Sequence, residues 1–275
     1  MNIEKLFGYK SSGQIWRLLI SEEDHLVVET RDHHTKEVSF HCYNLNLGKE
    51  IFSDLQLEEK NWLGIETFYK NIIFFHKFPQ KDMPGHKEII AFDILSRKIL
   101  WENRNVSFLF AHNNIIYGFK QGFEDRTFYS FDYLTGDLIQ ELGTDYKTIN
   151  SLRQKADQEK NWNDYIYPKI FSGEESPEIN NAVNAAIQDL EIEGNVEYNF
   201  TDGLLLFSFH GKVSDKIFNN RFLAVDLITG ETLIDEVLNA SSSSLYTDSF
   251  FVYKKFLFLL REKNEVLVYN LKTNA

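Results

Sequence analysis

Cysteine and proline are scarce in this chain of 275 residues, and each scarcity excludes a class of protein. The single cysteine, Cys42, has no partner within the chain, so a disulfide framework is impossible. Only four prolines interrupt the sequence, which favours long strands. The longest apolar runs, such as residues 256–260, are far too short to cross a bilayer as a helix.

Basic residues are outnumbered as well. The 29 lysines and arginines stand against 41 acidic residues, which gives a net charge of −12. A nucleic-acid or anionic-membrane partner would require clustered Lys and Arg, so we expect neither. The first residues show no basic segment followed by an apolar stretch, so we expect no signal peptide and a cytoplasmic location.

One short pattern recurs along the chain: a small residue, a bulky one, Asp or Asn, two further residues, Thr and Gly. Its copies lie at residues 224–230, 130–136, 42–48, 91–97 and 268–274, the first two being the clearest. The Asp or Asn positions are separated by 49, 39, 94 and 44 residues. Four-stranded propeller blades recur at about 40–50 residues. The spacing therefore predicts repeated blades, with one interval that contains extra sequence.

Each copy is preceded by a polar turn and a short apolar run, which together indicate four strands per repeat. In the first repeat the strands are expected at residues 15–21, 26–30, 37–45 and 50–55. The recurring pattern is then the turn between the third and fourth strands, because Asp or Asn binds its own backbone and Gly accepts a positive φ. Glycine occupies the last turn position at 48, 136 and 230, whereas Arg97 is a poorer fit and Asn274 an acceptable one.

The copies resemble the quinoprotein-type β-propeller repeat, which reads Ala-x-Asp-x-x-Thr-Gly-x-x-x-Trp. The second copy fits it with Ala91, Asp93, Ser96 and Trp101. The resemblance covers most of the chain outside residues 143–195, and the whole chain also looks like one of the uncharacterised bacterial propeller families. It implies the fold, but not the cofactor or dehydrogenase activity of the best-known members.

We therefore predict an all-β protein, a single β-propeller domain over residues 1–275 with five four-stranded blades. Residues 143–195 form a mainly helical insertion between blades 3 and 4, because removing these 53 residues from the 94-residue interval leaves 41. Six blades with one degenerate copy are the alternative. The last repeat stops after its third strand, so residues 4–9 are expected to supply the fourth; a loose N-terminal tail is the alternative.

Within the insertion, Ser176, Pro177 and Glu178 predict the start of a helix that stops near Gly194. A second helix is expected over residues 146–159. Three aromatic residues lie between the two helices, either as anchors of the insertion or as part of a binding surface: Trp162, Tyr165 and Tyr167.

We expect one decorated face, because connections between blades and the loops between second and third strands emerge on the same side. The long loops are residues 31–36, 77–87, 120–126 and 210–220, and variable loops on a rigid scaffold usually carry binding. Five histidines lie in or next to them: His33, His34, His76, His86 and His210. Because these come from three blades without a short ligand spacing, we interpret them as solvated loop residues and predict no metal and no cofactor.

The sequence contains no phosphate-binding glycine loop, no nucleophile elbow and no His-Glu-x-x-His motif, so no catalytic residues are assigned. The favoured function is a non-enzymatic binding or scaffold propeller with an unknown protein partner. The alternative is a small-ligand or glycan-binding protein or enzyme with its site in an axial funnel. Candidates for that site are Arg17, Glu66 and Tyr198, on the first strands of their blades.

Overall fold

The structure is a computed structural model that describes residues 2–79 and 85–272. It divides into two compact units, Ser12–Asn161 and Met1–Ser11 together with Trp162–Ala275. Both units consist mainly of antiparallel sheet. Within the described residues, no helix is long and apolar enough to span a membrane.

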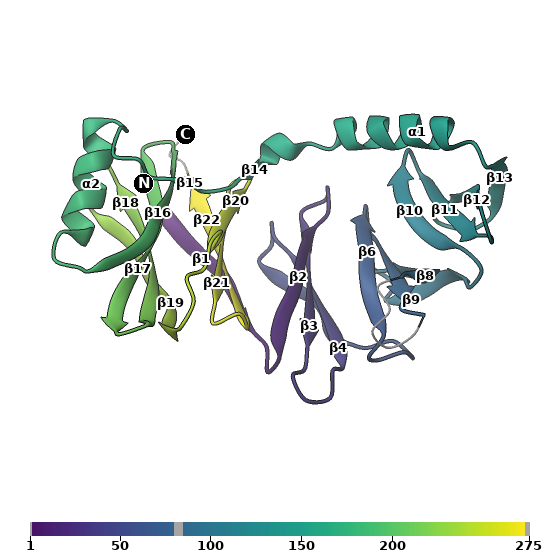
Figure 1. The fold of residues 1–275 in the computed structure, drawn as a ribbon, viewed down its shortest axis with the longest axis horizontal. Coiled ribbons are helices and arrows are strands. Elements are labelled where there is room, and N and C mark those ends of the chain that lie inside the picture. Colours follow the sequence, from purple (N-terminus) through teal and green to yellow (C-terminus); the bar gives the residue numbers. More distant parts are fainter. Residues whose placement is uncertain (1, 80–84, 273–275) are drawn as a thin grey trace. The chain divides into compact units, whose positions relative to one another are not determined.

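The described residues of the Ser12–Asn161 unit form three four-stranded sheets (Figure 1). The first comprises β2 (Gln14–Ile20), β3 (His25–Arg31), β4 (Val38–Asn44) and β5 (Lys49–Leu55). The second comprises β6 (Leu63–Tyr69), β7 (Ile72–Lys77), β8 (Lys87–Asp93) and β9 (Lys98–Asn103). The third comprises β10 (Ser107–His112), β11 (Ile115–Gln121), β12 (Arg126–Asp132) and β13 (Leu138–Gly143).

The other unit contains two five-stranded sheets. One comprises β15 (Lys169–Ile170), β16 (Ile192–Thr201), β17 (Leu204–Ser214), β18 (Ile217–Asp226) and β19 (Thr232–Ser242). The other comprises β1 (Asn2–Lys10), β22 (Glu265–Lys272), β21 (Phe256–Arg261), β20 (Phe250–Tyr253) and β14 (Tyr165–Ile166).

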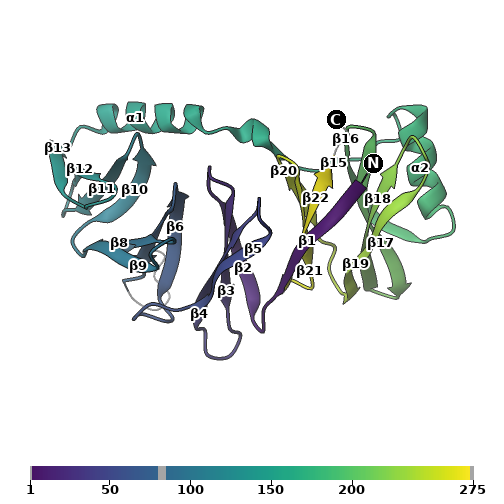
Figure 2. The ribbon, with the colours of Figure 1, turned by 180° about the vertical axis from the view of Figure 1, so that it is seen from behind.

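In four of the five sheets, four strands that follow one another in sequence pair in chain order. In the last sheet the fourth strand comes from the start of the chain: β1 pairs with β22 from Asn2↔Lys272 to Lys10↔Glu265 (Figure 2). The prediction that the N-terminal segment supplies the missing strand is therefore confirmed. Five up-and-down sheets of this kind are the blades of a β-propeller, as the repeat spacing predicts.

The recurring turns have the predicted chemistry. In the third blade, Asp132 Oδ1 accepts hydrogen bonds from the backbone N–H groups of Leu134 and Thr135, both at 2.9 Å. Gly136 then takes a φ of +73°. Arg97 adopts a φ of +57° at the equivalent position of the second blade, so the pattern forms there without glycine. Asn274 lies outside the described residues.

The first three blades pack against one another through large apolar side chains. Phe40 and Phe75 meet between the first and second blades, with ring centroids 4.7 Å apart. Trp101 of the second blade lies against the turn of the third blade, where its Nε1–H donates to the carbonyl oxygen of Tyr133 at 3.0 Å. The tryptophan of the repeat thus connects one blade to the next.

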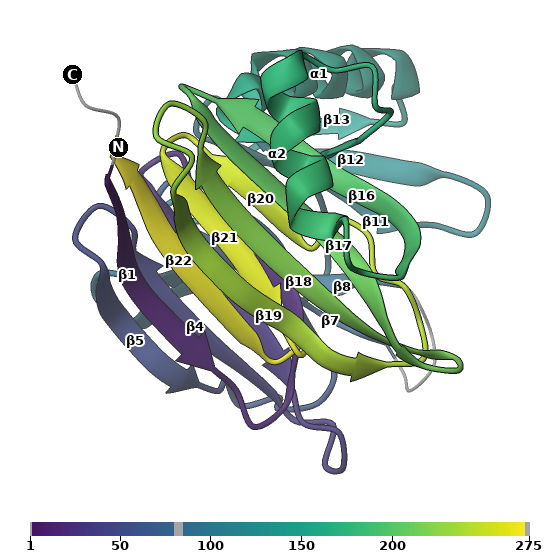
Figure 3. The same ribbon diagram turned by 90° about the vertical axis from the view of Figure 1, so that its left-hand side faces the viewer.

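The insertion forms two helices, α1 (Tyr146–Glu159) and α2 (Pro177–Ile187). Ile149 and Ala156 of α1 pack onto the third blade. Ile179 and Val183 of α2 pack onto the fourth blade, where α2 lies across the sheet (Figure 3). Each helix is therefore held by an apolar stripe, the arrangement typical of an amphipathic helix at a protein surface.

Two details of the insertion and its surroundings differ from expectation. Helix α2 ends at Ile187, and Gly194 lies instead in β16, with a φ of +72° beside a register shift. Residues 210–220 are a long hairpin rather than a loop, because β17 and β18 continue pairing to Ser214 and Ile217. At both places, residues that the sequence assigns to a helix end or a loop belong to paired strands, and their polar composition does not reveal this pairing.

Candidate functional site

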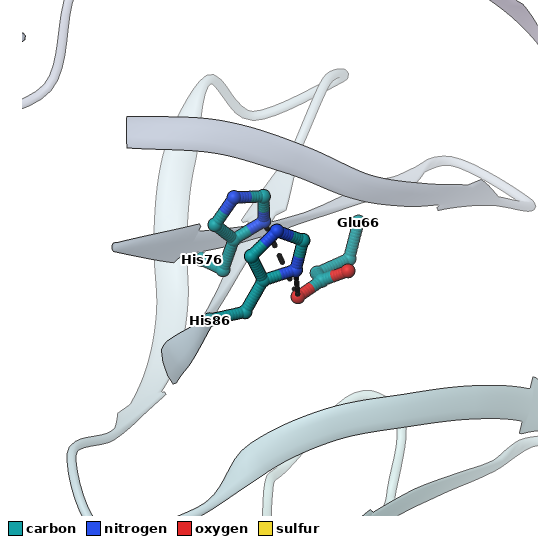
Figure 4. Close-up of side chains that lie close together, drawn as sticks. All are labelled: Glu66, His76 and His86. Atoms are coloured by element: carbon teal, nitrogen blue, oxygen red, sulfur yellow. Dashed lines mark hydrogen bonds and ion pairs between the residues drawn. The ribbon is translucent and has the colours of Figure 1, made fainter. Parts of the chain in front are cut away.

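The sequence-predicted candidates are divided between the two units. Six lie in the Ser12–Asn161 unit: Arg17, His33, His34, Glu66, His76 and His86. The other five lie in the second unit: Trp162, Tyr165, Tyr167, Tyr198 and His210. The structure brings Glu66, His76 and His86 together in the second blade, with one ligand atom of each within 4.8 Å of the others (Figure 4).

Three elements of the second blade supply this Glu66–His76–His86 cluster. Glu66 lies on β6 at a register shift between Ile65 and Thr67, and such a bulge re-aims the side chain of the extra residue. His76 lies on the neighbouring strand β7, and His86 directly precedes β8. Both histidine Nδ1 atoms approach the same carboxylate oxygen, Glu66 Oε1, at 3.2 Å from His76 and 2.9 Å from His86.

The two imidazole rings are stacked, with centroids 3.5 Å apart and planes 8° from parallel. The edge of Phe78 closes the cluster, because its ring lies 4.8 Å from His76 and 5.5 Å from His86 at nearly right angles. Gly64 lies opposite His76 in the strand pairing, and a Cβ there would approach His76 Nε2 to 2.9 Å. Only a residue without a side chain fits against that ring.

Burial differs across the cluster. The His76 side chain is 1% exposed, Glu66 is 12% exposed and His86 is 38% exposed. Burial lowers the pKa of His76 below its ordinary value, although the Glu66 carboxylate opposes the shift. Among the described residues 2–79 and 85–272, neither ring nitrogen of His76 makes a hydrogen bond of good geometry, although Nδ1 lies 3.2 Å from Glu66 Oε1. The cluster thus has a buried base, a half-buried carboxylate and a solvent-facing second base.

A second buried carboxylate lies close to this cluster. Glu29 is almost fully buried and accepts two hydrogen bonds from Arg31, at 3.1 Å and 2.8 Å. It also accepts from the backbone N–H of Ile65, next to Glu66, at 3.5 Å. The Arg17 side chain donates to the Ile65 carbonyl oxygen. Arg31 pairs with Glu29, and two histidines contact Glu66. Because both carboxylates already have partners, this arrangement does not favour the acid and base pair that glycoside hydrolysis requires.

The remaining histidines do not join the cluster. His33 and His34 are exposed in the loop after β3, as expected. His210 is buried in strand β17, where its Nε2 accepts from the backbone N–H of Tyr246 at 3.1 Å. The interpretation of solvated loop histidines is therefore wrong for His210, and also for the buried His76. Their strands continue past the positions where the sequence suggested that loops begin.

The aromatic residues of the insertion form a separate surface in the other unit. Trp162 is 60% exposed and Tyr167 is 54% exposed, whereas Tyr165 is half-buried against Tyr253 at 4.8 Å. The rings of Tyr165 and Tyr167 are 9° from parallel, and both lie near Phe251, at 6.4 Å and 6.0 Å. Tyr165 thus anchors the segment, whereas the side chains of Trp162 and Tyr167 remain accessible to solvent.

Strand pairing fixes the backbone of this segment. Strand β14 pairs with β20, the first strand of the last blade, through Tyr165↔Tyr253. Strand β15 pairs with β16, the first strand of the fourth blade, through Lys169↔Tyr198. Tyr198 itself packs edge-on against Phe171. The segment therefore covers the edges of two first strands, which the sequence did not predict.

The end of the sheet at which this segment lies also differs from expectation. The backbone N–H of Lys254, in the turn between β20 and β21, donates to the carbonyl oxygen of Asp164 at 2.7 Å. That turn is at the opposite end of the blade from the hairpin between β21 and β22. Residues 162–165 therefore lie at the end of this blade that carries the β20–β21 turn. The β21–β22 hairpin, which connects the second and third strands, lies at the other end. The expectation that the insertion and these loops share one face is wrong here.

Five up-and-down blades define the class of this protein as a β-propeller. A family described as a domain of unknown function (DUF4905) matches residues 20–101, which include the Glu66–His76–His86 cluster. No curated protein matches the chain.

Several solved structures are similar at low identity. A europium-containing methanol dehydrogenase is 10% identical with a TM-score of 0.31, covering 95% of this chain and 52% of its own. The β-propeller domain of the Trilobed protease from Pyrococcus furiosus is 12% identical with a TM-score of 0.34, covering 96% and 70%. The Dos1 propeller is 10% identical with a TM-score of 0.29, covering 94% and 55%. This chain thus spans about half the length of the methanol dehydrogenase chain.

Proposed function

We propose that this protein is a non-enzymatic binding propeller that holds a partner protein through Trp162, Tyr167 and Ile170. All three side chains are exposed and lie within nine residues of one another. Tryptophan and tyrosine are enriched among the residues that dominate binding energy, because each presents a large rigid area at low entropic cost. The exposure of these rings on a fixed backbone is the observation that carries the proposal.

The rigidity of the segment supports this role. Its backbone pairs with two different blades, and Asn199 Nδ2 donates to the Tyr167 carbonyl oxygen at 3.5 Å. A surface that is ordered before binding loses less conformational entropy when the partner arrives. Aromatic side chains that only anchored the insertion would be expected to bury most of their area, as Tyr165 does.

A glycan ligand is the second candidate. The exposed ring of Tyr167, held nearly parallel to the anchored ring of Tyr165, favours it, because flat aromatic faces stack on the apolar faces of sugar rings. This alternative uses the same surface, so one set of variants tests both. Binding of an arrayed glycan that requires Trp162 and Tyr167 would replace the partner protein with a saccharide.

The test is quantitative capture from lysate of the native host with the wild-type protein and a Trp162→Ala/Tyr167→Ala variant. We expect the variant to lose the specific partner, with an affinity for the purified partner lower by about 30-fold or more. Both side chains are exposed, so the melting temperature should change little.

The matched control is Ile228→Ala, which removes an exposed apolar side chain from the turn between β18 and β19 in the same unit. Capture should be unchanged in this variant. Retention of the partner by the double variant, or equal loss in the control, would show that the aromatic surface does not bind it.

A further inference from the structure

We propose that Glu66, His76 and His86 form a binding site for a divalent transition-metal ion of the zinc type. Two imidazole nitrogens and one carboxylate oxygen are a known ligand set for Zn²⁺, with a fourth position left to water or to another ligand. This site lies in the Ser12–Asn161 unit, so it is separate from the aromatic surface and does not depend on it.

The two distances from the carboxylate to the histidines are close to what a metal requires, and all three ligand atoms lie within 4.8 Å of one another. Ligand atoms at 2.0–2.2 Å from a tetrahedral Zn²⁺ are about 3.3–3.5 Å from one another. Glu66 Oε1 lies 2.9 Å from His86 Nδ1 and 3.2 Å from His76 Nδ1. These two carboxylate–imidazole distances therefore need only small shifts, whereas the orientation of one ring must change for both histidines to bind the ion.

The buried histidine supplies an independent observation. A buried polar side chain normally finds hydrogen-bond partners, and lacking them costs free energy. The His76 side chain is 1% exposed, yet neither ring nitrogen makes a hydrogen bond of good geometry with any residue that the structure describes. Its Nδ1 faces the carboxylate, and coordination of an ion there would satisfy this atom.

The surroundings hold two of the three ligands in place. Gly64 and Phe78 enclose the His76 ring, which fixes its orientation. The buried Glu29 adds negative charge nearby, although Arg31 holds it. The carbonyl oxygen of His86 accepts a hydrogen bond from Ser107 Oγ at 2.7 Å, which anchors the backbone of the third ligand.

Coordination requires one rearrangement. A metal lies in the plane of each imidazole that binds it, and two parallel rings 3.5 Å apart cannot both meet that condition. The buried His76 is fixed, so the more exposed His86 must rotate out of the stack. Metal binding is therefore expected to break the stacking of the two rings.

The experiment is calorimetric titration of tag-free, chelator-treated full-length protein with ZnCl₂, followed by Co²⁺ absorption spectroscopy. We expect one ion per chain and visible d–d bands of a tetrahedral Co²⁺ site. Glu66→Gln and His86→Phe should each weaken Zn²⁺ binding by about 100-fold or more, because each removes a ligand. The phenyl ring of His86→Phe preserves the stack on His76, so circular dichroism should remain that of the wild type.

The matched control is His33→Ala/His34→Ala, which removes two exposed histidines from the same unit without touching the cluster. Its Zn²⁺ affinity should stay within about twofold of the wild type. Zn²⁺ should also raise the melting temperature of the wild type and of this control, but not of His86→Phe. Substoichiometric binding by the wild type, or equal affinity in the wild type and both ligand variants, would overturn the proposal.

Discussion

Gly136 and Gly230 occupy the same turn position in two repeats but have different surroundings. Their φ angles are +73° and +74°, so any other residue meets the same backbone strain at both positions. A Cβ at Gly136 would lie 2.6 Å from the Trp101 ring, whereas a Cβ at Gly230 would meet nothing within 4 Å. Comparing the two glycines therefore separates backbone strain from packing between blades.

We expect Gly230→Ala to lower the free energy of unfolding by about 1 kcal/mol, the usual cost of the left-handed conformation. Gly136→Ala should cost about 1–3 kcal/mol more, because Trp101 must move from its contact with the next blade. Urea unfolding followed by circular dichroism measures both variants. Equal losses in the two variants would mean that Trp101 yields without cost and does not hold the blades together.

At the scale of single elements, the two helices of the insertion begin differently. Asp145 Oδ1 accepts hydrogen bonds from the backbone N–H groups of Lys147 and Thr148, at 3.0 Å and 3.2 Å, at the start of α1. The Thr148 hydroxyl, which donates to Asp145 Oδ2 at 2.6 Å, and these backbone bonds hold the pKa of Asp145 below its usual value. Ser176, at the start of α2, makes no such capping bond within the described residues, although the sequence predicts that the helix starts there.

Asp145→Ala should therefore lower the melting temperature by roughly 2–4 °C, because two backbone donors lose their partner. Ser176→Ala, the matched control, should leave it nearly unchanged. Thermal unfolding monitored at 222 nm measures both. A larger loss in the serine variant would mean that its hydroxyl caps α2 in solution and that the two helix starts are equivalent.

At the scale of the whole molecule, the repeats predict much of the fold and little of the candidate sites. Blade number, the turns and both helices follow from local patterns, since turn chemistry and apolar periodicity lie in adjacent residues. The cluster does not, because the sequence pattern places Glu66 at an axial site and His76 in or next to a loop. Predicting that Glu66 and His76 meet would require the pairing register of β6 with β7 and the bulge at Glu66. Contacts between strands determine both features.

The added strands of the insertion were missed for a similar reason. Strands β14 and β15 are two residues long each, which is too short to show the alternation of apolar and polar residues that identifies a strand in a sequence. Their pairing is determined by the exposed edges of β20 and β16. Short edge strands of this kind depend on the rest of the unit, and their own residues carry almost no signal.

The pairing of β1 with β22 joins segments from opposite ends of the sequence, and the repeats predict it. Ile3 packs against the core beneath the last blade, and β1 covers the full length of β22. Removing residues 1–10 would expose that strand edge, and an open edge invites pairing with other chains. We expect the truncated protein to be several kcal/mol less stable and to self-associate.

A synthetic peptide of residues 1–11 should restore the monomer and the melting temperature when added in excess, because it can pair with β22 as the native strand does. A scrambled peptide of the same composition is the control, and sedimentation velocity with thermal unfolding provides the measurement. If the truncated protein were monomeric and as stable as the intact chain, β1 would be a passive addition to a last blade that is already complete with three strands and β14. Rescue by the native peptide alone would instead show that register-specific pairing of the chain ends stabilises the molecule.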